Sequence, residues 1–504
     1  MSNNINQKIG SATKWSSITE IVAKLITPAT NMILARLLVP ESFGIVATIT
    51  MVISFAEVFT DAGFQKYIIQ HEFPDDETLD RSTNVAFWTN LGVSFIICGL
   101  IFLFRHSIAE LVGNSGLGNS ISIASVLIII AAFSSIQIAR YRRALDFKTL
   151  FFVRIITSLM PLVVTVPLAV VLRNYWALLI GTFASQLCNA IILTVRSKWK
   201  PKFYYNIELF KEMFAFTAWT LLESISIWLT LNIGTFIVGN RLSGHYLGIY
   251  KTSMSTVNSY MSVITAALTP VLFSALSRYQ NDEDNFRKTY YKFQRLTAIF
   301  VIPMGIGAFV YQDLVTRILL GSQWTEASGF IGVWGLTSAF SIVFANFSSE
   351  VYRSKGNPKV SLIMQLVHLA FLVPVLIISA TYGFKVLYMA RSLVRLQMIA
   401  CALLIMRVMY GFKVNHVVRN VLPMIASGTV MGVAGYLLKM ASTNVVWQVI
   451  SVILCIMVYF VVLFGVSSNT RRDFLESNFG RKLREKIKNG ELLKRFQETL
   501  NMHR

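Results

Sequence analysis

Charged and amide side chains inside long apolar runs are the residues of this sequence best suited to chemistry. In the run over residues 14–38 they follow helical spacing, so they share one face of a helix. Three further runs, over 43–70, 213–239 and 245–276, carry similar polar stripes. The stripes comprise, in chain order, Glu20, Lys24, Thr27 and Asn31; Thr50, Ser54, Glu57 and Asp61; Thr220, Glu223, Thr230 and Gly234; Lys251, Ser255, Asn258, Ser262 and Thr265.

Such residues are expensive to place in a membrane. An ionisable side chain within a transmembrane helix costs about 2.5–3.5 kcal/mol on insertion scales and usually faces a bundle interior or a water-filled cavity. We therefore predict that these four helices line a hydrated cavity. A structural alternative stays open, since Glu20 and Lys24 are an i,i+4 pair that can neutralise each other, and Ser and Thr commonly pack membrane helices together.

Two arginines form a second candidate cluster. Arg391 and Arg395 lie one helical turn apart and deep within the apolar run 385–407. Two like charges on one buried face need an acidic partner or an anionic ligand. Arg154 lies nearer the end of its run, and we expect its side chain to extend toward the membrane surface.

Motifs for enzymatic or metal chemistry are absent from the sequence. It contains no G-x-x-x-x-G-K-[ST], H-E-x-x-H or G-x-S-x-G pattern, and its six His show no metal-ligand spacing. Its four Cys lie far apart, without a C-x-x-C pair. We expect no catalytic residue, no metal site, no cofactor and no ATP hydrolysis, so that the protein is not an enzyme.

The elements that position these residues follow from composition. The 504 residues are 54% hydrophobic and 14% charged, against roughly 25% charged in soluble domains. Apolar runs near 20 residues recur throughout, which is the length of a helix that crosses ~30 Å of hydrocarbon. The sequence predicts an all-α integral membrane protein with fourteen spans, over 14–38, 43–70, 82–104, 118–139, 149–172, 175–195, 213–239, 245–276, 296–316, 327–351, 360–380, 385–407, 416–438 and 445–466.

The distribution of Lys and Arg predicts the orientation. With both termini placed in the cytoplasm, most of the 46 basic residues fall in cytoplasmic loops and the C-terminal tail. The opposite loops carry one apiece, namely Arg36, Arg105, Arg173, Arg241, Arg317, Lys385 and Lys439. This asymmetry follows the positive-inside rule. The net charge of +21 is then a topology signal, and we expect no nucleic-acid partner.

An internal repeat divides the chain. Phe43-Gly44-Ile45 matches Leu247-Gly248-Ile249, and "RYRRALDFK" from Arg140 matches "VYRSKGNPK" from Val351. Six spans in each half give a parallel repeat, whose substrate site is expected between the halves. We predict an N-terminal lobe (1–200), a C-terminal lobe (201–410), two further helices (411–466) and a basic amphipathic cytoplasmic tail (467–504).

Several motifs, taken in order, resemble one family. "ILARLLVPESFGIVA", "FTDAGFQKYIIQ", "RALDFK", "LGIYKTSMS", "LTPVLFSALSR" and "ILLGSQW" are similar to the polysaccharide transporter family of Wzx-type flippases, over about residues 8–410. That family belongs to the MOP exporter superfamily, with the MATE exporters and lipid II flippases. Val39 and Ser42 depart from its usual turn. The resemblance implies two six-helix lobes around a V-shaped cavity lined by helices 1, 2, 7 and 8.

The resemblance also implies a function. The substrate would be a polyprenyl-diphosphate-linked oligosaccharide, moved by alternating access to the outer leaflet of the bacterial inner membrane for surface polysaccharide assembly. Lys24, Lys251, Arg391 and Arg395 would attract the diphosphate, and Asn31 and Asn258 would bond the sugars. Membrane potential, or H⁺ or Na⁺ carried by the acidic residues Glu20, Glu57, Asp61 and Glu223, would drive the cycle.

Membrane lipids, a glycan polymerase and glycosyltransferases are the partners that this function suggests. Two alternatives stay open. A cation-coupled MATE-type exporter of small molecules is disfavoured because the deep charges are mostly cationic. A glycan polymerase or membrane glycosyltransferase is disfavoured because all predicted outer loops are short.

Overall fold

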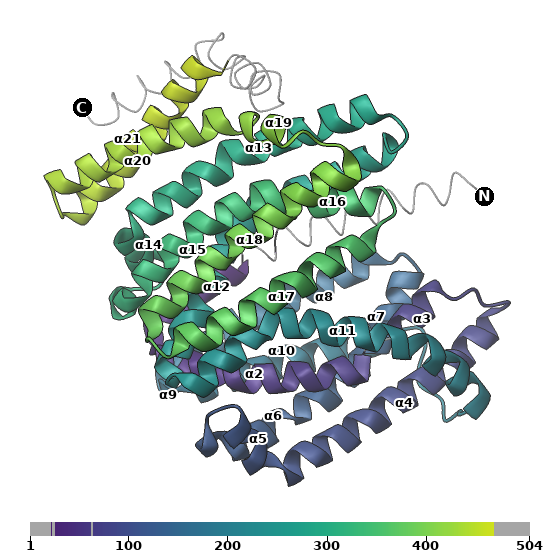
Figure 1. The fold of residues 1–504 in the computed structure, drawn as a ribbon. Helices are drawn as coiled ribbons and strands as arrows, with labels where there is room; N and C mark the ends of the chain where they lie inside the picture. Colours follow the sequence, from purple (N-terminus) through teal and green to yellow (C-terminus); the bar gives the residue numbers. More distant parts are fainter. Residues whose placement is uncertain (1–21, 23–25, 62–63, 468–504) are drawn as a thin grey trace, which may run out of the picture. The chain divides into compact units, whose positions relative to one another are not determined.

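The computed structural model of the chain describes residues 22, 26–61 and 64–467. Within these residues every regular element is a helix, and no strand is present (Figure 1). Eleven of the described helices are long and apolar enough to cross a membrane, or twelve if the bent pair Gly244–Ala266 and Val271–Arg278 counts as one span. The all-α membrane fold is confirmed. The count of fourteen is not, since part of the first predicted span lies outside the described residues.

The chain divides into two compact units, each assembled from three segments. Unit 1 comprises Met1–Ala267, Val315–Trp334 and Lys359–Met398, and unit 2 comprises Leu268–Leu314, Gly335–Pro358 and Ile399–Arg504. This division follows packing and does not test the predicted repeat boundaries, which stay predictions. The predicted tail helix lies outside the described residues.

The first continuous helix among the described residues of unit 1 covers residues 26–37, and most of the other helices of this unit follow it in chain order. They are α2 (Pro40–Asp61), α3 (Phe64–Gln70), α4 (Asp76–Leu103), α5 (Arg105–Leu111), η1 (Ser115–Leu117), α6 (Gly118–Ala124), α7 (Val126–Arg143), α8 (Phe147–Met160), η2 (Pro161–Thr165), α9 (Val166–Leu172), α10 (Tyr175–Arg196), α11 (Ile207–Arg241) and η3 (Ser322–Ala327).

Five helices contribute to both units: α12 (Gly244–Arg278), α14 (Gln312–Leu319), α15 (Ser328–Ser341), α17 (Pro358–Ala380) and α18 (Phe384–Tyr410). Unit 2 adds α13 (Glu283–Val310), η4 (Ile342–Asn346), α16 (Phe347–Ser354), α19 (Val414–Arg419), α20 (Leu422–Ala441) and α21 (Val445–Val466).

Short polar residues fix where many of these helices begin. A side-chain oxygen at the N-cap accepts a hydrogen bond from a backbone N–H that the helix leaves free. Residues of this kind precede six helices: Asp75, Asp146, Asn174, Asn206, Asp282 and Asn444. The backbone N–H of Thr78 and of Asn285 hold the pKa of Asp75 and Asp282 below the ordinary range of a carboxyl group.

The helices of unit 1 keep large apolar side chains on their outer faces. Leu103, Val171 and Val195 are each more than 70% exposed, which a water-soluble surface would not tolerate along whole helices. Inward faces form apolar clusters instead, such as the one joining α2, α6 and α7 around Ile49, Ile121 and Leu127. The exposed faces are those expected to contact lipid.

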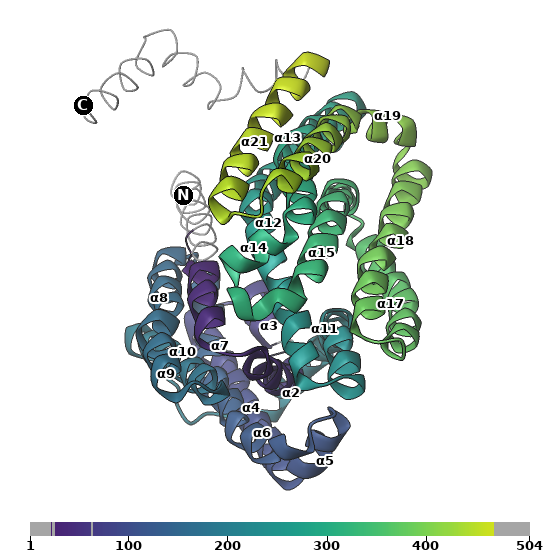
Figure 2. The same cartoon turned by 90° about the vertical axis from the view of Figure 1, so that its left-hand side faces the viewer.

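In unit 2, α13, α20 and α21 pack side by side, as Figures 1 and 2 show. Tyr311, at the end of α13, donates a buried hydrogen bond to Ser451 Oγ at 2.9 Å. Gly428 and Gly432 of α20 lie against the side chain of Ile306, where a Cβ would not fit without a shift. Small residues thus let these helices approach closely, as is usual in membranes.

Candidate substrate-binding cavity

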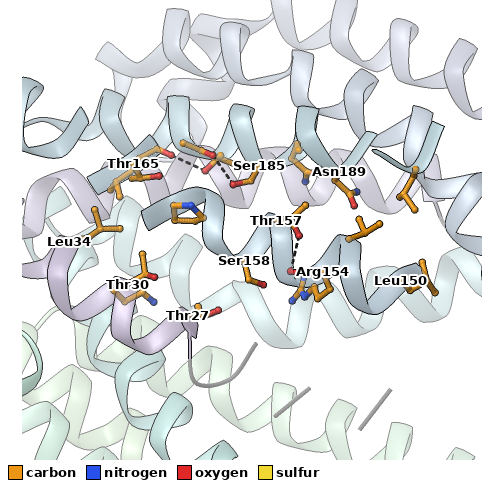
Figure 3. A pocket seen from close by; sticks show the side chains of 18 of the residues that line it. Thr27, Thr30, Leu34, Leu150, Arg154, Thr157, Ser158, Thr165, Ser185 and Asn189 are labelled. Atoms are coloured by element: carbon orange, nitrogen blue, oxygen red, sulfur yellow. Dashed lines mark hydrogen bonds between the residues drawn. The ribbon is translucent and has the colours of Figure 1, made fainter. Parts of the chain in front are cut away.

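A cavity of about 830 Å³ lies within unit 1 (Figure 3). Its walls come from the helix over 26–37, the first turns of α2, the end of α7, and α8, η2 and α10. In Figure 2, α8, α9 and α10 lie together beside the first helices of the chain. Every described residue that lines the cavity therefore belongs to the first predicted repeat.

The described part of the lining is polar and carries few charged side chains. Ten of the lining side chains are hydroxyls or amides: Thr27, Thr30, Asn31, Thr157, Ser158, Thr165, Thr182, Ser185, Gln186 and Asn189. Among the residues that the structure describes, the charged ones that line it are two arginines, Arg142 and Arg154, and no described Asp or Glu does. These residues suit a ligand with many hydroxyl groups and a negative charge.

Several of these hydroxyl groups have their own proton engaged. Thr30 donates to Ile26 O at 3.0 Å, Thr182 to Leu178 O at 2.9 Å, and Ser185 to Gly181 O at 2.9 Å. A hydroxyl that donates to its own helix keeps lone pairs that can still accept hydrogen bonds. These oxygens are therefore set to accept from ligand O–H groups, while Asn31, Gln186 and Asn189 supply amide donors.

Local backbone features hold the wall of the cavity in place. Pro161 opens a π-helical turn, η2, which ends at Thr165 beside the cavity. Such turns are rare and often occur at functional sites. On the facing helix, a Cβ added to Gly181 would lie 2.8 Å from Thr165 Cβ and closer still to its hydroxyl oxygen. Only glycine at 181 lets α10 approach η2 so closely.

The two arginines predicted in the second repeat converge on one aromatic ring. Trp334 of α15 is fully buried, and the guanidinium carbon of Arg395 lies 3.4 Å from its ring centroid. Arg391 lies 5.0 Å from the same ring and donates from Nε to Tyr250 Oη at 3.2 Å. Its Nη1 is buried without a hydrogen-bond partner among the described residues.

The other predicted site residues that the structure describes do not lie together at one site. Asn31 lines the cavity, whereas Lys251 and Asn258 do not. Lys251 is half-buried and donates to Thr235 Oγ1 at 3.3 Å, and Asn258 is exposed. Glu57 is half-buried on α2. Four residues lie wholly, or with their side chains, outside the described part: Glu20, Lys24, Asp61 and Glu223. The roles predicted for all of these residues stay predictions.

Most of the residues of α8 and α10 that line the cavity are not among those predicted from the sequence. Their spacing is helical in both runs, at Thr157, Ser158 and Pro161 and at Thr182, Ser185 and Asn189. This periodicity is the feature of the sequence that could have indicated a shared polar face. Arg154, which we expected to extend toward the membrane surface, lines the cavity. No group of three or more His, Cys, Asp or Glu able to hold a metal ion occurs within the described residues.

Comparison with known proteins places the chain among polysaccharide-related membrane proteins. A family model described as polysaccharide biosynthesis protein matches residues 33–329. The chain is 22% identical over 366 residues to the lipopolysaccharide biosynthesis protein WzxC of Escherichia coli (strain K12), covering 71% of this chain and 70% of that relative. It is 22% identical over 354 residues to the teichuronic acid biosynthesis protein TuaB of Bacillus subtilis (strain 168), covering 70% and 72%.

Solved structures share the fold. The lipid II flippase MurJ, in an inward closed conformation, matches with a TM-score of 0.73 at 16% identity, covering 88% of this chain and 97% of that one. An inward-facing MATE multidrug resistance transporter of the MOP superfamily matches with a TM-score of 0.59 at 12% identity, covering 80% and 99%. At these identities the likeness concerns the fold alone.

Proposed function

Because the chain belongs to the polysaccharide biosynthesis protein family, we propose that it is a flippase for a lipid-linked oligosaccharide. The substrate is a polyprenyl-diphosphate glycan, which crosses from the cytoplasmic to the outer leaflet of the bacterial inner membrane for surface polysaccharide assembly. The names of the relatives and the MurJ-like fold support this proposal. The protein acts as a transporter and not as an enzyme.

The observation that carries the proposal is the lining of the cavity in unit 1. Its volume, about 830 Å³, lies within the ~300–1,000 Å³ usual for small-molecule sites. Ten hydroxyl and amide side chains match the alternating donors and acceptors of a sugar. A few sugar units of the head group bind here while the polyprenyl chain stays in the bilayer.

Cationic side chains receive the diphosphate in this proposal. Arg142 and Arg154 stand at the cavity itself. Lys24, Lys251, Arg391 and Arg395 are the predicted cations of the remaining transport path. Guanidinium groups suit phosphate because they donate paired hydrogen bonds and stay charged.

Alternating access and cytoplasmic termini complete the proposal. The half-buried Glu57, together with the predicted Glu20, Asp61 and Glu223, offers sites for a coupling H⁺ or Na⁺. A MATE-type exporter of cationic compounds is the alternative, and the fold alone permits it. The described part of the cavity lining disfavours it, because the two arginines there would repel a cationic ligand.

The test fills the cavity from one helix. Ser185→Leu with Asn189→Leu replaces two lining groups one turn apart on α10, and should trap lipid-linked glycan on the cytoplasmic leaflet. The matched control, Leu187→Ala with Ile191→Ala, changes the same helix on its exposed face, where these residues are 49% and 53% exposed. Both double variants are expected to reach wild-type abundance in the membrane. Normal glycan export by the cavity variant would refute the proposed site.

A further inference from the structure

The two turns that mark the internal repeat touch each other in unit 1. The first turn of α2 crosses the first turn of α12 at Gly44 and Gly248. A Cβ on Gly44 would lie 2.9 Å from the carbonyl carbon of Gly244, and a Cβ on Gly248 would lie 2.7 Å from that of Pro40. The contact is thus reciprocal, backbone against backbone, and it joins the two predicted repeats at their predicted extracytoplasmic ends.

Hydrogen bonds across the same repeats surround this crossing. Arg36 Nη2 donates to Ile318 O at 2.7 Å. Trp324, fully buried in η3, donates from its indole N–H to Ala35 O at 2.6 Å, and Gln323 donates to Leu38 O at 2.9 Å. Together with the glycine crossing, these hydrogen bonds join the two predicted repeats, and we call this set of contacts the seal.

His245 completes the seal through two carboxylates. Its Nδ1 lies 2.8 Å from Glu41 Oε1 of α2, and its Nε2 lies 2.9 Å from Glu326 Oε2 of η3. An ionised carboxylate only accepts hydrogen bonds, so both ring nitrogens have to donate. A neutral imidazole carries a single N–H. The geometry with both bonds therefore holds one extra proton.

We propose that His245, Glu41 and Glu326 form a proton-binding site whose occupancy keeps the predicted extracytoplasmic end closed. When the proton leaves, one carboxylate faces the lone pair of a ring nitrogen, and that bond is lost. Acidic conditions then favour the closed seal and alkaline conditions favour its opening. The inference rests on the proposed transport cycle only in requiring a state in which this end is open.

The surroundings of His245 suit this role. Glu41 and Glu326 are the charged groups that act on the imidazole from the neighbouring elements, and Tyr246 is its ring neighbour on α12, 5.4 Å away between ring centroids. The three side chains are between 31% and 61% exposed, so the proton can exchange with water. Partial exposure also keeps each ion pair weak, so we expect the closed-to-open ratio to change by about twofold to tenfold.

Cysteine accessibility in the full-length protein tests the proposal without any glycan. Ser42, next to Glu41 and buried in the seal, becomes Cys in a variant lacking the four native cysteines. Its labelling by a membrane-impermeant maleimide is followed from about pH 5 to pH 8, the range over which histidine titrates. The exposed Thr443, replaced by Cys in a parallel protein, corrects for the pH dependence of thiol reactivity.

The corrected labelling rate should rise about twofold to tenfold with pH when His245 is present. His245→Lys supplies a cation with several donors at every pH, so labelling should stay low and flat. His245→Ala should label rapidly and show no pH dependence. A flat profile with His245, or an unchanged profile in His245→Ala, would overturn the proposal. Normal glycan export by cells lacking the protein would refute the proposed function and leave this measurement unaffected.

Discussion

Replacing Gly248 by Ala should hold open the seal proposed at the predicted extracytoplasmic end. The new Cβ would lie 2.7 Å from the carbonyl carbon of Pro40, and ordinary contact begins near 3.4 Å. To bring the Cβ to 3.4 Å from this carbon, the two backbones have to separate by about 0.7 Å. The Pro40 carbonyl oxygen is closer to the Cβ and requires a larger separation. Pro40 cannot rotate out of the way as a flexible side chain could.

The energetic cost follows from the rigidity of both partners. Forcing an extra methyl group into a packed contact costs typically ~1–3 kcal/mol. A cost of about 1–3 kcal/mol borne only by the closed state shifts its ratio to the open state by roughly 5-fold to 150-fold. Alanine also gains up to about 1 kcal/mol over glycine in a helix, but both states of α12 share that gain.

Labelling of Ser42→Cys by an impermeant maleimide measures the shift directly, and surface polysaccharide measures its consequence. Gly92→Ala is the matched control, because Gly92 also lies inside a helix but has nothing within 4 Å of the added Cβ. With Gly248→Ala, the thiol of Ser42→Cys should react faster with the maleimide, and the cells should carry less surface polysaccharide. Gly92→Ala should change neither quantity. Equal labelling in the two variants would refute the reasoning that a backbone crossing at Gly248 closes this end.

Three further predictions concern charge, buried hydrogen bonding and helix capping. Alanine at Lys24 and Lys251 together should abolish glycan export at unchanged membrane abundance; continued export would remove both from the transport path. Tyr311→Phe should lower stability by about 1–3 kcal/mol in detergent melts, since the buried partners of the hydroxyl in α20 and α21 lose it, whereas the exposed Tyr279→Phe should not. The lowered pKa of Asp282 means that its cap stabilises α13 above the ordinary carboxyl range and is lost as pH falls through the lowered value. Asp282→Ala should therefore weaken protection of the first turn against hydrogen exchange at neutral pH, and the difference should disappear in acid.

Much of the fold could be predicted because its physical causes are local. Apolar runs of membrane length become helices, since lipid offers backbone groups no other partner. Short polar residues such as Asn174 and Asp282 then start helices where the sequence turns. These features depend on neighbours in the chain, so a single sequence contains them.

The cavity could be predicted only in part, for a tertiary reason. Asn31 stands in a stripe with charged neighbours and is recognisable, and it lines the cavity. Thr157 and Ser185 look like ordinary helix-packing residues until α8 and α10 face each other. That facing depends on Gly181 against Thr165, and no spacing within either helix announces the contact.

The turn around Gly44 shows the same limit at the level of the repeat. The sequence identifies Phe43-Gly44-Ile45 and Leu247-Gly248-Ile249 as equivalents but does not say that they meet. Their contact explains why both positions are glycine, since each lacks room for a Cβ against the partner's backbone. Two repeats related by an axis along the membrane normal can meet on that axis, and equivalent residues then face one another.

In the proposed cycle, the energy for transport and the control of gating come from different features of the system. A diphosphate head group carries about two negative charges at neutral pH, and moving them outward across ~100 mV, inside negative, gains roughly 4–5 kcal/mol. A proton on His245 contributes far less, because its ion pairs are exposed and weak. In our proposal this proton therefore biases the opening of the predicted extracytoplasmic end and does not supply the work of transport. In the proposed function, the cavity, whose described charged residues are two arginines, holds the anion on which the potential acts. Drive by membrane potential thus needs no coupling cation, whereas an uncharged substrate in the same cavity would require one.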